Sequence, residues 1–385
     1  MKSNSTVYPY SPFRFLKRAK PTSTFLPPKA ISPTQIKRIL ICRHLPKVAF
    51  HGRSIEEKIL SIFLDPQVRF GPRKYVLDYK DEWLQQLSHF VKQGKPIKFT
   101  LLGFPFKIPV SLKTNRTLPD LGELLALQQL SFLMCLVKKV YKLGGVVYVF
   151  TEGPFASFAD VSKKEAKAYY NRLVTLNRQF GFNHEIKLID LGSLEKFVPN
   201  TKLELRERYK KLSSLYKAKN ADFMTKYKSA FPSVFRIVNT RKLSIHELRQ
   251  IYSDGQTKIS GQAKRLKDAL IVRANKAILH YFAYLKMRDD FRLVERSQPG
   301  ALKLTVSPKP HRLGILPIDS KIKILYTHGV PVYKADKKTF DIQYLFDLER
   351  AGKTYQPVYL NGDKEDKPFY YSESGKQSDK LGRNN

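Results

Sequence analysis

Two short phrases of the sequence carry ionisable side chains where a chain can present them to a ligand. The first is FPFK at residues 104–107, in which a lysine follows an aromatic-proline turn. The second is LPDLGE at residues 118–123, which places two carboxylates three residues apart on one face of a helix start. Lys107 could clamp a phosphate or, if burial lowers its pKa, act as an amine or base near a carbonyl substrate. Asp120 and Glu123 could hold a substrate ammonium or share acid-base work.

Both phrases also have a purely structural interpretation. Lys107 belongs to a chain with 70 Lys and Arg residues, so an exposed lysine at this position needs no function. The residues from Thr117 to Asp120 fit a helix cap, in which Asp120 satisfies backbone donors at the helix start. The sequence leaves the choice between cap and catalyst open.

Two further candidates follow predicted strands. Glu152-Gly153 comes after an apolar run, where an acid with a flexible neighbour can approach a ligand closely, although an ordinary turn would look the same. His328 precedes Gly329, and it is the histidine best placed for acid-base chemistry near neutral pH. A lone histidine is nevertheless often structural.

The elements that must position these residues alternate along the chain. Apolar runs at 96–102, 146–150 and 184–191 predict strands, and helical periodicity predicts helices over 118–140 and 162–181. This order favours an α/β fold with a mostly parallel sheet and helices on both faces. Further strands are predicted over 301–306 and 321–325. Because ligands bind beyond the carboxyl ends of parallel strands, the segments after these strands are expected to converge on one cleft.

The chain divides into three parts by composition. Residues 1–48 contain no acidic residue and several prolines, which predicts a basic, mostly extended N-terminal arm. Residues 49–360 are predicted to form a single α/β domain, whose part from 203 to 290 is mostly helical and very basic. Residues 361–385 predict a polar C-terminal tail that frays.

The net charge of +37 favours anionic partners, which include phosphorylated substrates, nucleic acid and acidic membrane surfaces. No recognised RNA or DNA module accompanies the basic stretches, so solvated helix faces explain them more simply. The start of the sequence lacks an apolar signal-peptide core, and two cysteines, Cys42 and Cys135, predict a reducing compartment. We therefore expect a cytoplasmic protein. The apolar stretch at 118–140 carries charged and amide side chains and predicts a buried helix instead of a membrane span.

Common catalytic signatures are missing. The sequence contains no G-x-G-x-x-G after the first strand, no Walker loop, no G-x-S-x-G elbow, no H-E-x-x-H and no paired C-x-x-C. Dinucleotide, nucleotide, hydrolase and zinc chemistry therefore lack support.

The order of the motifs resembles the isocyanide synthases of the pyoverdine/dityrosine biosynthesis family. The resemblance covers about residues 40–335 and rests on FPFK, LPDLGE, Glu152-Gly153, Arg273 ahead of Ala277, LKLTVSP at 302–308 and His328-Gly329-Val330. It implies a Rossmann-like fold with a helical insertion. It also implies that the α-amino group of tyrosine or tryptophan becomes an isonitrile, with ribulose 5-phosphate supplying the carbon and no metal or redox cofactor in that step.

The resemblance also implies roles for individual residues. Lys107 and Arg273 would bind phosphate or carboxylate, Asp120 and Glu123 would hold the amine or transfer protons, and His328 would do acid-base work. The remaining candidates for substrate binding are Glu152, Gly153 and Lys303.

Several positions depart from the family pattern. The departures are Ile108 and Val110 after the FPFK lysine, Phe158 where a carboxylate is usual, Ser307 where a histidine is usual, and Tyr326-Thr327 in place of Pro-Trp. Losing ionisable groups changes protonation states and reaction rates. Three interpretations therefore stay open: an isonitrile synthase, a relative that acts on another amine or phosphosugar or is catalytically silent, and a binding protein for nucleic acid or acidic membranes. The sequence does not determine the oligomeric state or the role of the arm.

Overall fold

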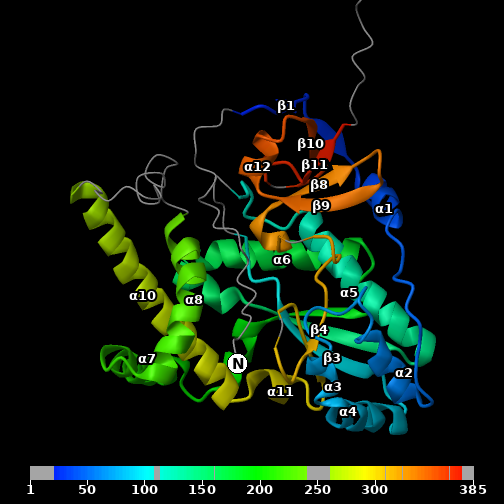
Figure 1. Cartoon of the computed structure of the whole chain (residues 1–385), viewed down its shortest axis with the longest axis horizontal. Helices are drawn as coiled ribbons and strands as arrows, with labels where there is room; N and C mark the ends of the chain where they lie inside the picture. The colour runs from blue at the N-terminus through cyan, green and yellow to red at the C-terminus, as the bar shows by residue number, and fades with distance from the viewer. Residues whose placement is uncertain are drawn as a thin grey trace, which may run out of the picture.

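The computed structural model describes residues 21–107, 113–159, 161–240, 261–307, 309–322, 324–363 and 365–374. Its described part contains two β-sheets, which Figure 1 shows one above the other, with a group of helices at the side of the lower sheet. The lower sheet carries the predicted site, and the upper sheet is built from both ends of the chain.

The lower sheet has five strands, all parallel, in the order β5-β4-β3-β6-β7. The strands are β3 (Ile97–Gly103), β4 (Gly145–Thr151), β5 (Ile186–Asp190), β6 (Leu302–Thr305) and β7 (Leu313–Gly314). Strand β3 is buried at five of its seven residues, which explains its near-continuous apolar sequence. The strand order runs outward from β3 in both directions, so ligands are expected where β3 and its neighbours end.

Helices α4, α5 and α6 pack on this sheet. Helix α4 (Lys80–Lys92) contacts β3 and β6, whereas α5 (Leu121–Val140) and α6 (Lys163–Gln179) contact β5 and each other. Helix α5 is long and apolar enough to pass a test for a membrane span, but 78% of its most apolar window is buried inside the protein. The structure therefore confirms that α5 is a core helix.

The upper sheet is mixed and has six strands. Its order is β1-β10-β11-β8-β9, with β2 paired to β10. The strands are β1 (Thr24–Phe25), β2 (Lys29–Ile31), β8 (Val330–Lys334), β9 (Thr339–Gln343), β10 (Thr354–Leu360) and β11 (Tyr370–Glu373). Strands from the first 31 residues thus pair with a strand near the C-terminus.

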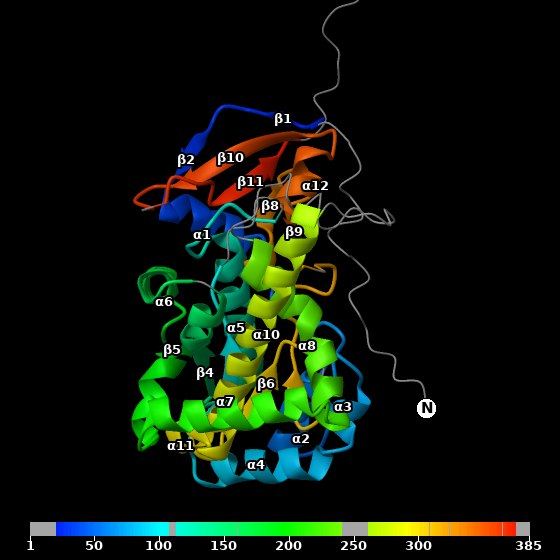
Figure 2. The same cartoon turned by 90° about the vertical axis from the view of Figure 1, so that its left-hand side faces the viewer.

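The helical part between β5 and β6 contains α7 (Thr201–Lys217), α8 (Ala221–Thr240), α10 (Gly261–Asp290) and α11 (Leu293–Ser297). Figures 1 and 2 show α7, α8 and α10 grouped at one side of the parallel sheet, and α10 contacts both α7 and α8. The predicted helical character of residues 203–290 is confirmed for the described residues. The remaining elements are α1 (Pro33–Ile41), α2 (Ile55–Ile62), α3 (Lys74–Leu77), α12 (Leu345–Glu349) and the 3₁₀ turns η1 (Gly153–Ala159), η2 (Leu191–Phe197) and η3 (Tyr326–His328).

Three sequence predictions need correction. The described residues between 321 and 325 form no strand, and this segment leads into η3. The predicted arm is not mostly extended over 33–41, because Ser32 and Gln35 form a capping box that starts α1. The predicted tail contributes β11, whose tyrosines are buried in the upper sheet. Strands β1 and β2 of the predicted arm pair with β10, and β11 of the predicted tail pairs with β10 and β8. Pairing between residues so far apart in the chain leaves no local signal in the sequence.

Candidate functional site

The turn after β3 aims Lys107 into the protein. Phe104 adopts a left-handed backbone conformation with φ of 51°, which is uncommon for a residue other than glycine. Its N–H donates a hydrogen bond to Tyr326 Oη at 3.2 Å, and the two rings contact each other. The aromatic-proline turn is therefore held from η3, and it directs the following lysine inward.

Lys107 meets both carboxylates of the LPDLGE phrase. Its ammonium pairs with Asp120, and its Nζ lies 3.1 Å from Glu123 Oε2. All three side chains have no solvent exposure. We call Lys107, Asp120 and Glu123 the buried triad.

The triad also forms the cap of α5. Asp120 is the N-cap residue, and its Oδ1 accepts a hydrogen bond from Gly122 N at 2.8 Å. Glu123 Oε2 accepts from Asp120 N at 2.9 Å, which completes a capping box. The structural interpretation of Asp120 is therefore confirmed, and the ion pair with Lys107 exists in addition to the cap.

Burial raises the pKa of Glu123 to about 8. The ammonium of Lys107 opposes this shift, and the carboxylate of Asp120 adds to it. A carboxyl group with such a pKa changes its protonation state near neutral pH, which is the property that a general acid or base requires.

Tyr169 on α6 connects the triad to a cavity. Its hydroxyl donates a hydrogen bond to Glu123 Oε1 at 3.2 Å, and its side chain also lines the cavity. Burial, together with the charge of Glu123, raises the pKa of Tyr169 well above its usual value, so the hydroxyl keeps its proton. Sequence reasoning missed Tyr169, because a tyrosine on an amphipathic helix carries no local signal of such a contact.

The cavity opens at the carboxyl edge of the sheet and has a volume of about 660 Å³. This volume lies within the usual range for small-molecule sites. We call it the carboxyl-edge cavity. Its wall contains residues at the ends of three neighbouring strands, together with residues of α6, η2, α7 and α10. The residues that line it are Pro105, Thr151, Gly153, Pro154, Phe158, Lys163, Lys164, Ala166, Lys167, Tyr169, Tyr170, Asp190, Gly192, Glu195, Leu205 and Tyr284.

The cavity wall combines three kinds of side chain. Three lysines at the start of α6 could hold a phosphate or carboxylate, because they lie near the positive end of the helix dipole. Two carboxylates, Asp190 and Glu195, lie on the same wall, and burial raises the pKa of Glu195. Aromatic rings supply apolar area. This combination suits a ligand that has a ring, an amine and an acidic group.

Glu152 and Gly153 follow β4 as predicted. Gly153 lines the carboxyl-edge cavity, where a Cβ atom would lie 3.2 Å from Asp190 Oδ1, so the glycine permits this close approach. Glu152 is half-buried, and burial raises its pKa against the opposing charges of Arg288 and Lys309. The binding roles of both residues stay predictions.

Two further predicted residues, His328 and Arg273, lie on η3 and α10. His328 is exposed at the end of η3, whereas its neighbour Tyr326 is buried against Gly122 and Phe104. Arg273 is half-buried on α10. Lys107 and Glu123 meet, but both are fully buried and neither is among the residues that line the carboxyl-edge cavity, and His328 is exposed. The expected convergence of these residues on one hollow therefore stays a prediction. The roles of His328 and Arg273 stay predictions, and Ile108 and Val110 lie outside the described residues.

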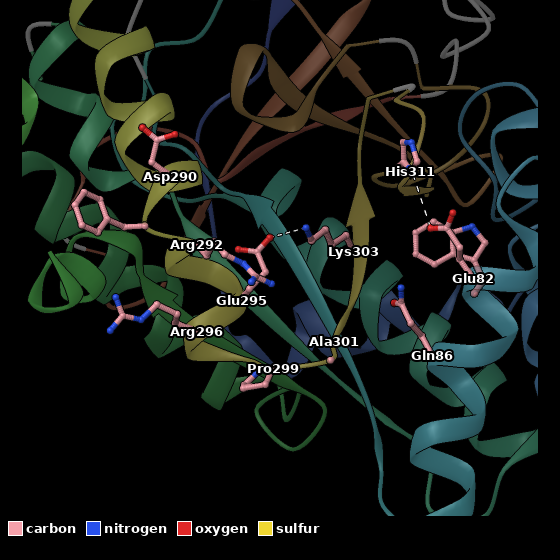
Figure 3. A pocket seen from close by; sticks show the side chains of 13 residues that line it. Glu82, Gln86, Asp290, Arg292, Glu295, Arg296, Pro299, Ala301, Lys303 and His311 are labelled. Atoms are coloured by element: carbon pink, nitrogen blue, oxygen red, sulfur yellow. Dashed lines mark ion pairs between the residues drawn. The ribbon is translucent and has the colours of Figure 1, made fainter. Parts of the chain in front are cut away.

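Lys303 lines a second cavity, of about 870 Å³, which we call the α4–α11 cavity. It lies near the amino end of β6, at the opposite edge from the ends of β3 and β4. Figure 3 shows two pairs of side chains in this cavity. Lys303 Nζ lies 2.5 Å from Glu295 Oε1, and His311 Nδ1 lies 4.0 Å from Glu82 Oε2. Because parallel sheets bind ligands at their carboxyl edge, we place the candidate site at the smaller cavity.

Among the described residues, no group of three or more His, Cys, Asp or Glu side chains is arranged to hold a metal ion. The fold and the candidate site together define an α/β protein with a ligand-sized cavity at the carboxyl edge of a parallel sheet, backed by a buried carboxyl group with a raised pKa.

Comparisons with known proteins agree with this class. Residues 87–276 match the family of the pyoverdine/dityrosine biosynthesis protein. An L-tryptophan isonitrile synthase of Fischerella ambigua is 25% identical over 75% of this chain and 81% of its own length. An L-tyrosine isonitrile synthase of Xenorhabdus nematophila is 27% identical over 40% of this chain. The crystal structure of the PvcA protein from Pseudomonas aeruginosa superimposes with a TM-score of 0.63 at 20% identity, covering 83% of this chain and 99% of that one.

The chain belongs to the pyoverdine/dityrosine biosynthesis family, whose curated relatives include isonitrile synthases. The matched region spans 47% of the Xenorhabdus relative and 21% of an isocyanide synthase A from Aspergillus fumigatus. The activity of this chain is therefore a separate question.

Proposed function

We propose that this protein converts the α-amino group of an aromatic amino acid, tyrosine or tryptophan, to an isonitrile, with ribulose 5-phosphate as the carbon donor. The observation that carries the proposal is the contact from the carboxyl-edge cavity through Tyr169 to Glu123. The names of the relatives support the class of substrate. We further propose that the parallel sheet is Rossmann-like and that the protein works in the cytoplasm.

The residues present suit the first step of such a reaction. An amino acid enters as an ammonium, and it must lose a proton before its nitrogen can attack a ketone. Ionised Glu123 can accept that proton through the Tyr169 hydroxyl, which gives its own proton to Glu123 Oε1 and takes one from the amine. Lys107 stabilises the ionised carboxylate from the other side.

The rest of the cavity wall offers groups for the remaining parts of the substrates. Phe158 and Tyr170 provide apolar area for an aromatic ring, and the lysines of α6 provide charge for the phosphate. Phe158 also favours a second candidate function, because it stands in the cavity wall where the family pattern has a carboxylate. The second candidate is an enzyme that acts on a different amine with the same carbon donor.

Purified protein incubated with tyrosine or tryptophan and uniformly ¹³C-labelled ribulose 5-phosphate tests the proposal. Mass spectrometry is expected to find an amino-acid isonitrile that carries one labelled carbon. Glu123→Gln should reduce the rate about 10²-fold to 10⁴-fold, the usual contribution of general acid-base catalysis. Glu57→Gln is the matched control, because Glu57 occupies the same capping-box position on α2.

Absence of an isonitrile from any aromatic amino acid would rule out the proposal. Consumption of ribulose 5-phosphate with another amine would then support the second candidate. Tight, salt-sensitive binding of nucleic acid without any turnover would support a binding protein instead.

A further inference from the structure

The connection between β10 and β11 holds the residues on both sides of Asp120 in the chain. Glu365 accepts hydrogen bonds from Thr117 N at 2.7 Å and Leu118 N at 3.0 Å. Phe369 O accepts one from Leu121 N at 3.2 Å. The backbone on both sides of Asp120 is therefore tied to the segment 363–369, which the sequence predicted to be a loose tail.

Arg116 fixes this segment from inside the protein. Its side chain is 1% exposed, and its Nη2 donates to Asp363 Oδ2 at 2.6 Å. Its Nη1 donates to Lys367 O at 2.6 Å, and its Nε lies 3.4 Å from Glu365 Oε2. The guanidinium also lies over the ring of Phe369. Arg116 thus joins the loop before α5 to the C-terminal connection.

Asp363 contacts a second guanidinium on a different element. Its Oδ1 lies 3.6 Å from Nη2 of Arg172, and the Asp363 side chain is only 4% exposed. Arg172 follows Tyr169 by three residues on α6, so both side chains lie on the same helix face. One carboxylate therefore joins the loop that carries Asp120 to the helix that carries Tyr169.

We propose that Asp363 is a positioning residue, which holds α6 against the start of α5 so that the Tyr169 hydroxyl reaches Glu123. Without this carboxylate, Arg172 would face the like charge of Arg116 without the acid that joins them, and Arg116 would keep its pair with Glu365. The repulsion between the two arginines would move α6 away from the loop and lengthen the contact between Tyr169 Oη and Glu123 Oε1. The catalytic consequence rests on the proposed function, but the geometric claim does not.

Asp363→Asn tests the geometric claim through the titration of Glu123. The readout is the ¹³Cδ resonance of Glu123, assigned by its loss in Glu123→Gln. A shorter or longer Tyr169 contact changes this titration, because a hydrogen bond donated to a carboxylate favours its ionised form. We expect the pKa of Glu123 to be higher in Asp363→Asn than in the wild-type protein. Asp366→Asn is the matched control, because Asp366 is exposed in the same connection and should leave the titration unchanged.

A second variant covers the case in which Asp363→Asn does not fold. Arg172→Gln removes only the α6 end of the bridge and leaves the pair between Arg116 and Asp363. It is expected to shift the Glu123 titration in the same direction by a smaller amount. Folded Asp363→Asn or Arg172→Gln protein with a wild-type titration of Glu123 would overturn the inference, even if its stability were reduced.

Activity provides an independent readout. If the proposed function holds, Asp363→Asn should lower kcat about tenfold to hundredfold with little change in KM, since a small misplacement of a proton-transferring group has this effect. Wild-type kcat in folded Asp363→Asn would overturn the inference. If the protein makes no isonitrile, the titration still decides the geometric claim, so the two failures are distinguishable.

Discussion

The buried triad and the α4–α11 cavity contain similar side chains in opposite surroundings. In the triad, Lys107, Asp120 and Glu123 have no exposure and pair with one another. In the α4–α11 cavity, the pair between Lys303 and Glu295 is partly exposed, with 41% and 33% of the side chains accessible. Burial raises the pKa of Glu123. Partial burial acts in the same direction on Glu295, but its hydrogen bonds to Lys303 and the backbone, with the charges of Lys303 and Arg292, together lower its pKa. The same two residue types therefore give a carboxyl group with a raised pKa in one place and one with a lowered pKa in the other.

The largest difference in stability between the two regions is expected when the lysine of each is replaced. Lys107→Met leaves Asp120 buried without its counter-ion, and it should lower the free energy of unfolding by about 3 to 5 kcal/mol. Lys303→Met should change it by less than about 1 kcal/mol, because solvent screens an exposed pair. Urea denaturation of both variants measures the contrast. Equal losses of unfolding free energy in the two variants would show that burial does not distinguish the two ion pairs.

The second difference concerns the pH dependence of stability. Because the pKa of Glu123 is higher in the folded protein than in the unfolded chain, the folded state binds an additional proton between about pH 4.5 and about pH 8. Stability should therefore fall as the pH rises through this range. Glu123→Gln should remove this fall, which is on the order of a few kcal/mol.

Glu295→Gln should change the opposite end of the pH profile. The pKa of Glu295 is lowered on folding, so its contribution is present above its unfolded pKa and disappears as the pH falls through its folded pKa. The variant should therefore lose stability at neutral pH and match the wild type in acid. Urea titrations from pH 2 to pH 9 measure both profiles, and profiles of the same sign would contradict the assignment.

A smaller loss of stability is expected when the Tyr169 hydroxyl, which contacts the triad, is removed. Tyr169→Phe leaves Glu123 Oε1 without its donor and should cost about 1 to 3 kcal/mol of stability. Tyr170→Phe is the matched control, because its half-buried hydroxyl donates to the backbone oxygen of Leu188. Thermal unfolding of the two variants measures the difference. A larger loss in Tyr170→Phe would show that the contact with Glu123 is not special.

Asp120→Asn tests how the charge of Asp120 affects the pKa of Glu123. Asparagine can also cap a helix, so the start of α5 should persist. Removal of the Asp120 charge should lower the pKa of Glu123, because the repulsion between the two carboxylates disappears. Glu123 would then ionise and pair with Lys107, which limits the loss of stability to less than that of Lys107→Met. A Glu123 titration at or above its wild-type pKa would contradict this expectation.

The sequence determined the parts of this protein that local pattern controls. The strands predicted over 96–102 and 146–150, the capping box at Ser162 and the helical part from about 203 are confirmed, because periodicity and caps depend on neighbouring residues. A cap before α5 was also predicted, but over Thr117 to Asp120, whereas Asp120 and Glu123 form it. The motif order also indicated the family. Three contacts depend on the tertiary structure alone. Lys107 pairs with both carboxylates, Tyr169 links Glu123 to a cavity, and Asp363 pairs with two arginines. These contacts join residues 13 to 247 positions apart, and their effect on pKa depends on burial, which a linear sequence does not encode.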